Sequence, residues 1–101
     1  MSRSVVDDAA EKRFAVSIDG TSARLDYELD GDRLLLLHTE VPEGLRGQGV
    51  GGQLVEAALT KAGADHLTIV PWCPYARKWL KEHPEKIGDV TLDFRSAPSK
   101  K

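Results

Sequence analysis

The chain has 101 residues, of which 41% are hydrophobic and 30% are charged, and its formal net charge at pH 7 is -2. This length supports one hydrophobic core and therefore one domain, and the slightly acidic balance argues against a nucleic-acid-binding surface. We expect neither a secretory leader nor a membrane span. Because a single cysteine excludes an intramolecular disulfide, we expect a cytoplasmic protein, either a monomer or a weak homodimer, without nucleic-acid or membrane partners.

Three strands are predicted in the first part of the chain. Alternating apolar residues indicate a strand over 13–19, ended by the turn pair Gly20-Thr21, and a second strand over 23–30. An Asp-Gly-Asp turn then predicts a hairpin with the next strand. Residues 33–41 carry leucines on both faces, which is typical of a central strand that is buried on both sides.

A glycine-rich stretch and an amphipathic helix follow these strands. Apolar residues recur at helical spacing over 50–62, with polar residues on the other side of the predicted helix. Gly63 is placed where such a helix ends. The sequence His-Leu-Thr-Ile-Val over 66–70 then indicates another buried strand.

A second helix is predicted over 73–83. Pro74 suits the first helical position, which makes Cys73 the N-cap, and the proline after His83 ends the helix. A short strand is predicted over 90–94. The order is three antiparallel strands, helix, strand and helix, which predicts an α/β (α+β) domain with helices packed around one sheet.

The expected organisation is one minimal domain over residues 12–95. Residues 1–11 mix small and charged side chains without a hydrophobic period, and residues 96–101 form a short basic tail. We expect both of these terminal segments to be flexible.

The stretch EGLRGQGVGG, from Glu43 to Gly52, is half glycine. Gly47, Gly49 and Gly52 match the G-x-G-x-x-G dinucleotide fingerprint, but that fingerprint follows the first strand of a βαβ unit, whereas three strands precede it here. A P-loop is excluded because no Gly-Lys-Ser/Thr follows. The third interpretation is an anion site, in which consecutive amides before a helix cradle phosphate oxygens and Arg46 adds positive charge. The alternative is a glycine-rich connector that binds no ligand.

The run from Arg46 to Gly51, RGQGVG, resembles the [Q/R]-x-x-G-x-[G/A] motif of the GNAT (GCN5-related N-acetyltransferase) superfamily, in which this loop binds the pyrophosphate of coenzyme A. The segments HTEVP…LRGQG and P-x-CPYA…HPE extend the likeness, over about residues 12–90, to the small single-domain GNAT-like N-acetyltransferases. The resemblance implies a GNAT-like, mostly antiparallel sheet and an acetyl-CoA-dependent N-acetyltransferase. It implies contacts to acetyl-CoA or coenzyme A from Thr39, Val41, Arg46, Gly47, Gln48, Gly49, Val50 and Gly51.

Cys73 and Tyr75 are the candidates for handling the thiolate of coenzyme A. As an N-cap, Cys73 would stand where the helix dipole favours negative charge, although a lone cysteine is often a small buried hydrophobe. Many GNAT enzymes use the tyrosine of N-x-x-A-x-x-x-Y as the acid. With Ala76 as the shared alanine, Leu80 takes the tyrosine position, so Tyr75 or Cys73 would have to replace the acid. The alternative for Tyr75 is a packing role.

His38 and Glu40 are candidates for accepting the proton of the amine. Alternation places them on one face at the end of the central strand, near which GNAT enzymes often use a carboxylate or a histidine as base. The alternatives are a solvated charge and a hydrogen-bonded structural histidine. His66 and His83 have no partners at ligand spacing, so no metal site is expected.

The acetyl acceptor is expected to be an amine on a small molecule or a protein, which the sequence does not identify. A second hypothesis is an acyl-CoA-binding or interaction module with little or no turnover. It follows from the missing tyrosine and from a chain too short for an obvious acceptor-binding lobe.

Overall fold

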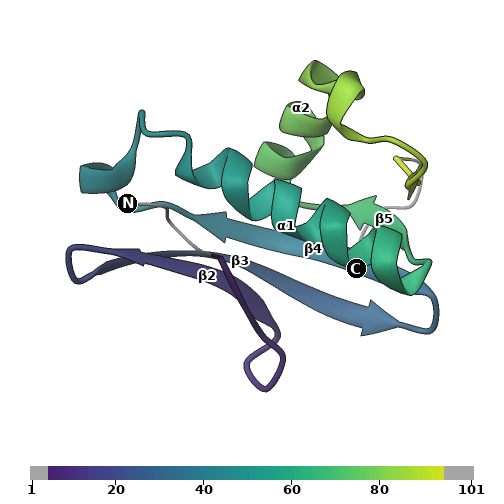
Figure 1. Cartoon of the computed structure of the whole chain (residues 1–101), viewed down its shortest axis with the longest axis horizontal. Coiled ribbons are helices and arrows are strands. Elements are labelled where there is room, and N and C mark those ends of the chain that lie inside the picture. Colours follow the sequence, from purple (N-terminus) through teal and green to yellow (C-terminus); the bar gives the residue numbers. More distant parts are fainter. Residues whose placement is uncertain (1–4, 95–101) are drawn as a thin grey trace, which may run out of the picture.

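The first half of the chain folds into an antiparallel meander. In the computed structural model, which describes residues 5–94, strands β1 (Val6–Asp8), β2 (Arg13–Ile18), β3 (Thr21–Asp30) and β4 (Arg33–Glu40) pair in chain order (Figure 1). Apolar side chains alternate along β2 and β3 as predicted, and one face of the meander is buried. The three strands expected from the sequence are therefore confirmed.

Strand β1 lies in the segment 1–11, for which no element was predicted. It is only three residues long, and two of them are aspartates, so it carries no alternating pattern. Its backbone pairs with β2, with Val6 opposite Ala15. A tertiary partner, and not local sequence preference, makes this segment a strand. The flexibility expected for residues 1–4 and 96–101 concerns residues outside the described range.

The turn between β2 and β3 lies one residue earlier than predicted. Asp19 and Gly20 have φ angles of 52° and 80°, and Thr21 already belongs to β3. Two consecutive residues with positive φ are characteristic of the tight turn that best matches the twist of a hairpin. Aspartate tolerates this conformation, which is why Asp19 can occupy the first position.

Strand β4 is central, as predicted, between β3 and β5. The leucines at 34–36 are buried, but Leu37 is 37% exposed, so burial on both faces does not extend along the whole strand. The register with β3 passes from Leu36 to His38 and leaves Leu37 without a partner. This β-bulge kinks the strand and turns Leu37 toward solvent.

The second half of the chain adds parallel strands to the meander. It contains η1 (Glu43–Leu45), α1 (Val50–Asp65), β5 (Thr68–Pro71), α2 (Pro74–Glu82), η2 (Pro84–Lys86) and β6 (Thr91–Leu92). Strand β5 pairs parallel to β4, and β6 pairs parallel to β5. The result is one mixed six-stranded sheet with two helices, which confirms the expected α/β (α+β) class.

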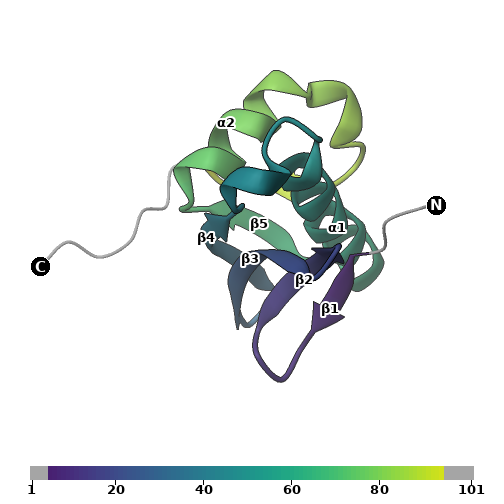
Figure 2. The same ribbon diagram turned by 90° about the vertical axis from the view of Figure 1, so that its left-hand side faces the viewer.

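Both helices pack on the same face of the sheet (Figures 1 and 2). Connections between parallel strands are right-handed, so two connections that step in the same direction place their helices on one face. The core between the helices and the sheet includes Phe14, Leu25, Leu34, Leu36, Leu54, Ile69 and Leu80. In the part of the chain described, no helix covers the opposite face.

Helix α1 does not end at Gly63. It continues to Asp65, and His66, with φ 56°, is the left-handed residue whose N–H donates to the Ala62 carbonyl. Glycine is the usual residue at such a position, so its presence at 63 pointed to the wrong end. The left-handed cap also removes His66 from the predicted strand, and β5 begins at Thr68.

Candidate functional site

The parallel strands β4 and β5 separate near their carboxyl ends. Their register ends where Leu36 pairs with Pro71, whereas β4 continues to Glu40. At the point where the two strands begin to separate, the Cys73 N–H donates to the Leu36 carbonyl at 2.8 Å. Because the bulge at Leu37 bends β4 at this level, the last residues of β4 lead away from β5 toward the glycine-rich loop.

The glycine-rich loop presents backbone donors to an open space. Gly47 and Gly49 have φ angles of 82° and 74°, which favour glycine, and a Cβ built on either would meet no atom within 4 Å. Val50, Gly51 and Gly52 are the first residues of α1, so their N–H groups have no acceptor inside the helix. A ligand can therefore approach the loop backbone closely at the positive end of the helix dipole.

A cavity of about 380 Å³ lies between the end of β4, this loop and the start of α2. Its volume is in the range of small-molecule sites. Figure 2 shows the loop between β4 and α1 in front of the helices. The lining residues are Thr39, Val41, Leu45, Arg46, Gly47, Gly49, Val50, Gly51 and Tyr75. Seven of the eight residues expected to contact acetyl-CoA are among them.

The eighth expected contact residue, Gln48, directs its side chain elsewhere. Its Nε2 donates to the Gly44 carbonyl at 3.1 Å and so stabilises the conformation of the loop. The Arg46 Nε donates to the Val41 carbonyl at 3.2 Å, which holds the guanidinium beside the end of β4. Arg46 thus contributes a fixed positive charge at the rim of the cavity.

Two of the loop glycines serve helix packing. A Cβ on Gly51 would lie 2.5 Å from the Tyr75 hydroxyl oxygen, and one on Gly52 would lie 2.7 Å from Trp79 Nε1. Atoms cannot approach this closely, so both positions exclude a larger residue while the aromatic rings stay in place. Of the glycines assigned to phosphate binding, Gly51 is covered by Tyr75 whereas Gly47 and Gly49 stay open.

Cys73 and Tyr75 begin α2 but have different surroundings. Cys73 is the N-cap and Pro74 the first helical residue, as predicted. The Cys73 side chain is 2% exposed and does not line the cavity; its Sγ lies 3.1 Å from the Thr39 hydroxyl. Tyr75 lines the cavity and is 44% exposed. Burial of part of its ring, followed by electrostatic interaction with Cys73 and Glu82, raises the pKa of the Tyr75 hydroxyl.

His38 and Glu40 share a face, as expected from alternation, but neither lines the cavity. Their side chains are exposed, and His38 Nε2 lies 3.1 Å from Glu40 Oε1. Their cross-strand neighbours are Asp26 and Arg24, on the face of the sheet opposite the helices. Only the thickness of β4 separates this pair from the cavity, because Thr39 between them points to the helix side.

Two further kinds of site can be examined in residues 5–94. No group of three histidine, cysteine or acidic residues there is arranged to hold a metal ion. Neither helix in this range has the length and apolar character needed to cross a lipid bilayer.

Comparison with known proteins identifies the family to which this arrangement belongs. Residues 13–90 match the family described as GCN5-related N-acetyl-transferase. The chain belongs to the GCN5-related N-acetyltransferase family. It is 37% identical over 83 residues to Protein NATD1 of Mus musculus, covering 79% of this chain and 76% of the relative. Identity to Protein NATD1 of Homo sapiens is 37%, covering 79% and 74%, and to that of Danio rerio 34%, covering 79% and 76%.

In this member of the GCN5-related N-acetyltransferase family, sequence reasoning did not place two residues near the cavity. Leu45 lines the cavity from η1, and its isolated position in a glycine-rich loop gave no periodic signal. Trp79 contacts the first turn of α1 beside it. Its spacing of four from Tyr75 predicts a shared helix face, but no local pattern shows that this face meets two glycines.

Proposed function

We propose that this chain binds acetyl-CoA in the cavity beside the glycine-rich loop and transfers the acetyl group to an amine. The observation that carries the proposal is the opening of the backbone at Gly47 and Gly49 next to the first amides of α1. Bound acetyl-CoA supplies a thioester, whose acyl carbon accepts a nucleophile and whose sulfur leaves as a thiolate. Membership of the GNAT family supports this choice of donor.

The loop fits the diphosphate part of the donor. The amides of Val50 and Gly51 face the cavity end of α1, where donors and helix dipole together favour an anion. Arg46 adds a charge that stays positive at any working pH. These groups would hold phosphate oxygens without a conformational change, because the glycines already have the required backbone geometry.

The separation of β4 from β5 fits the acyl end of the donor. Apolar side chains of Val41, Leu45 and Val50 line the cavity between the loop and Thr39. We assign the backbone of residues 39–41 to positioning the acyl carbonyl, since past Leu36 this strand edge has no pairing with β5.

Tyr75 is the group that we assign to protonate the departing thiolate. It lines the cavity, and a tyrosine hydroxyl is protonated at neutral pH, so it can donate a proton there. Cys73 is buried against the Thr39 hydroxyl, so we assign it to holding the end of β4. Leu80, at the usual tyrosine position, is fully buried in the core and cannot serve as the acid.

Glu40 and His38 are assigned to the proton of the amine. They lie on the other face of β4, so they would act on an acceptor that approaches from that face. The hydrogen bond between them lets the carboxylate orient the imidazole.

The second candidate function is an acyl-CoA-binding module with little turnover. The observation in its favour is that a core leucine, Leu80, replaces the tyrosine that many relatives use. Both functions require coenzyme A binding, so turnover separates them.

Calorimetry with acetyl-CoA, coenzyme A and ATP tests the binding step. We expect both coenzyme A species to bind to the purified, ligand-free protein and ATP to bind more weakly. No heat from either coenzyme A species would refute both candidate functions.

Release of free coenzyme A in the presence of amines, peptides and polyamines tests turnover. We expect Tyr75→Phe to lower kcat by about 10²-fold, the usual contribution of a general acid, and Cys73→Ala to lower it far less. Binding without release by any acceptor favours the binding module. Release that is unaffected by Tyr75→Phe contradicts the assignment of Tyr75.

A further inference from the structure

The two helices meet through two consecutive glycines and two aromatic residues that are one helical turn apart. Gly51 and Gly52 belong to the first turn of α1, and Tyr75 and Trp79 are four residues apart on one face of α2. The rings stand where side chains of α1 would otherwise be, at 2.5 Å and 2.7 Å from ideal Cβ positions. Two such points together set the rotation of α2 about its own axis.

Trp79 is itself held firmly. Its ring stacks on His83, with ring centroids 4.2 Å apart and an interplanar angle of 20°. The His83 Nδ1 donates to the Trp79 carbonyl at 2.9 Å. Beneath them, Ala76 and Leu80 anchor α2 in the core with no exposed surface. Trp79 can therefore transmit a defined position to the rest of the helix.

Tyr75 depends on packing for its position. Within residues 5–94 its hydroxyl makes no hydrogen bond, and nearly half of its surface is exposed. Its ring and hydroxyl lie against Gly51, so a small rotation of α2 would move the hydroxyl relative to the cavity. Trp79 does not line the cavity but makes the neighbouring contact on the same two helices.

We propose that Trp79 is the positioning residue for Tyr75: seated on Gly52, it holds α2 at the rotation that keeps the Tyr75 hydroxyl over the first turn of α1. Its effect on the reaction rests on the proposed function, in which Tyr75 donates the proton. Its effect on the position of Tyr75 is independent of that function. The two effects can be measured separately.

Trp79→Ala is the direct test, with kinetics and a phenolate absorbance titration as readouts. Of the two tyrosines, Tyr27 is buried and its pKa is raised far more, so Tyr75 ionises at lower pH. We expect the pKa of Tyr75 to fall toward its usual value, because a freely moving ring is better hydrated. Lys78 and Glu82, whose charges also affect the Tyr75 pKa, are not substituted, so the shift in pKa reports packing. We expect kcat to fall about tenfold with KM changed by less than about twofold, as for misplacement of a catalytic group.

Four further variants separate positioning from loss of structure. Gly52→Ala should also lower the Tyr75 pKa and kcat, because the new methyl group on α1 displaces the Trp79 ring. In the double variant Gly52→Ala/Trp79→Ala the new methyl occupies space left by the indole, so the effects should be less than additive. Trp79→Phe keeps a ring for His83 and should shift the Tyr75 titration less, which provides the test if Trp79→Ala does not fold. Gly63→Ala, a helical glycine at the other end of α1, should leave both readouts unchanged.

The Tyr75→Phe background decides whether Trp79 acts through Tyr75. There, adding Trp79→Ala should lower kcat no further. The proposal would be overturned if Trp79→Ala lowered kcat in the Tyr75→Phe background as much as it does in the wild type. It would also be overturned if the Tyr75 titration were unchanged in folded Trp79→Ala. If Tyr75→Phe retains full kcat, the proton-donor role fails, and the titration alone then decides whether Trp79 positions Tyr75.

Discussion

Helix α1 contains three glycines whose surroundings differ. Gly51 and Gly52 sit beneath the rings of Tyr75 and Trp79, whereas Gly63 faces solvent and a Cβ there would lie 3.8 Å from Val90. Helix propensity alone disfavours all three by the same amount, about 1 kcal/mol relative to alanine. Packing therefore decides which of them the fold requires.

Substitution by alanine should have opposite effects at two of these glycines. Gly63→Ala should raise the free energy of unfolding by about 0.5–1 kcal/mol, because alanine loses less chain entropy and meets no close atom. Gly52→Ala should lower it by about 1 kcal/mol, because overpacking against Trp79 outweighs the gain in propensity. Urea denaturation measures both. Equal stabilisation by the two changes would show that α2 moves aside freely.

The element that defines the candidate site is the loop joining β4 to α1. It combines a bulged strand end, a short 3₁₀ turn and two glycines with positive φ before the first helical amides. None of these features binds a ligand by itself. Together they place unpaired amides, an arginine and an apolar cavity at one point.

Gly49→Val should weaken the binding of coenzyme A at least tenfold while far-UV circular dichroism stays largely unchanged. Valine at φ 74° is strained, and relief of that strain reorients the amides at the start of α1. Gly44→Val is the matched control, because this loop position has no positive φ and no atom within 4 Å of a Cβ. Calorimetry compares the two variants. Equal affinities would place the phosphate elsewhere.

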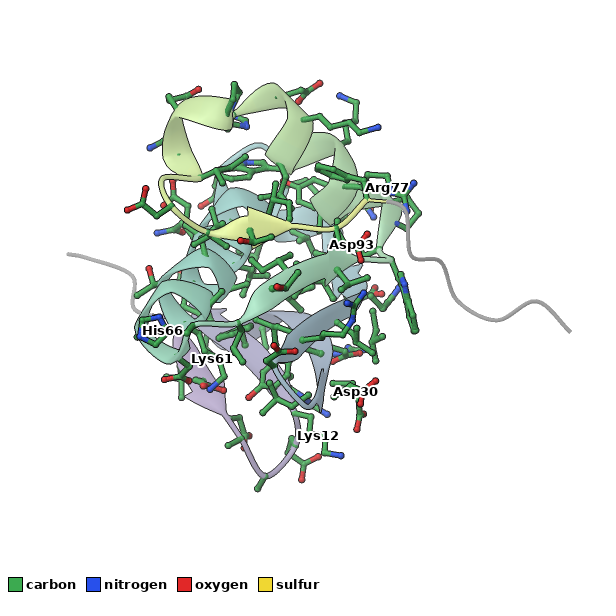
Figure 3. The ribbon with its side chains drawn as sticks, turned by 90° about the vertical axis from the view of Figure 1, so that its right-hand side faces the viewer. Lys12, Asp30, Lys61, His66, Arg77 and Asp93 are labelled. Atoms are coloured by element: carbon green, nitrogen blue, oxygen red, sulfur yellow. The ribbon has the colours of Figure 1, made fainter. Side chains whose placement is uncertain are left out.

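At the scale of the whole molecule, a polar cluster ties the edge strand β1 to α1. The Tyr27 hydroxyl donates to one oxygen of Asp7, and Lys61 Nζ lies 3.0 Å from the other. Tyr27 is buried beside Phe14, with ring centroids 4.8 Å apart. Figure 3 shows Lys61 near the end of α1, beside the purple N-terminal strands. The cluster connects residues that are distant in the sequence and links β1 to β3 and α1 through side chains.

This cluster predicts a loss of stability at alkaline pH. Burial raises the pKa of Tyr27, and its hydrogen bond to Asp7 raises it further; a separate hydrogen bond from Lys61 to Asp7 raises the pKa of Lys61. The native state therefore keeps protons that the unfolded chain releases above about pH 10. Stability is fully present below that pH and falls above it, by about 1.4 kcal/mol per pH unit for each retained proton.

Urea denaturation of Tyr27→Phe between neutral pH and pH 11 tests this prediction. The variant should lose about 1 kcal/mol at neutral pH with its hydrogen bond, and its stability should fall less steeply above pH 10. Tyr75→Phe is the control. Because Tyr75 is much more exposed than Tyr27, this variant should keep the steep loss of stability above pH 10. A parallel pH dependence in wild type and Tyr27→Phe would contradict the role of Tyr27.

Local patterns were sufficient for most of the fold. Strands β2 and β3 and helix α1 follow from apolar periodicity, and β4 follows from its run of leucines. Helix α2 and its N-cap at Cys73 follow from the prolines at 74 and 84. The positions of the turn and of the helix end were missed, because Asp19 and His66 adopt left-handed conformations in which glycine is the usual residue. Strand β1 was missed because its partners lie far away in the chain.

The sequence by itself determined the family and the make-up of the loop, since glycine spacing and Arg46 are local features with a direct physical meaning. Only the tertiary structure decided which residues meet. It placed Tyr75 in the cavity, buried Cys73 against Thr39, and put His38 and Glu40 on the opposite face of β4. These outcomes depend on the rotation of α2 and on the bulge in β4. Both are set by packing between segments that no local pattern relates to one another.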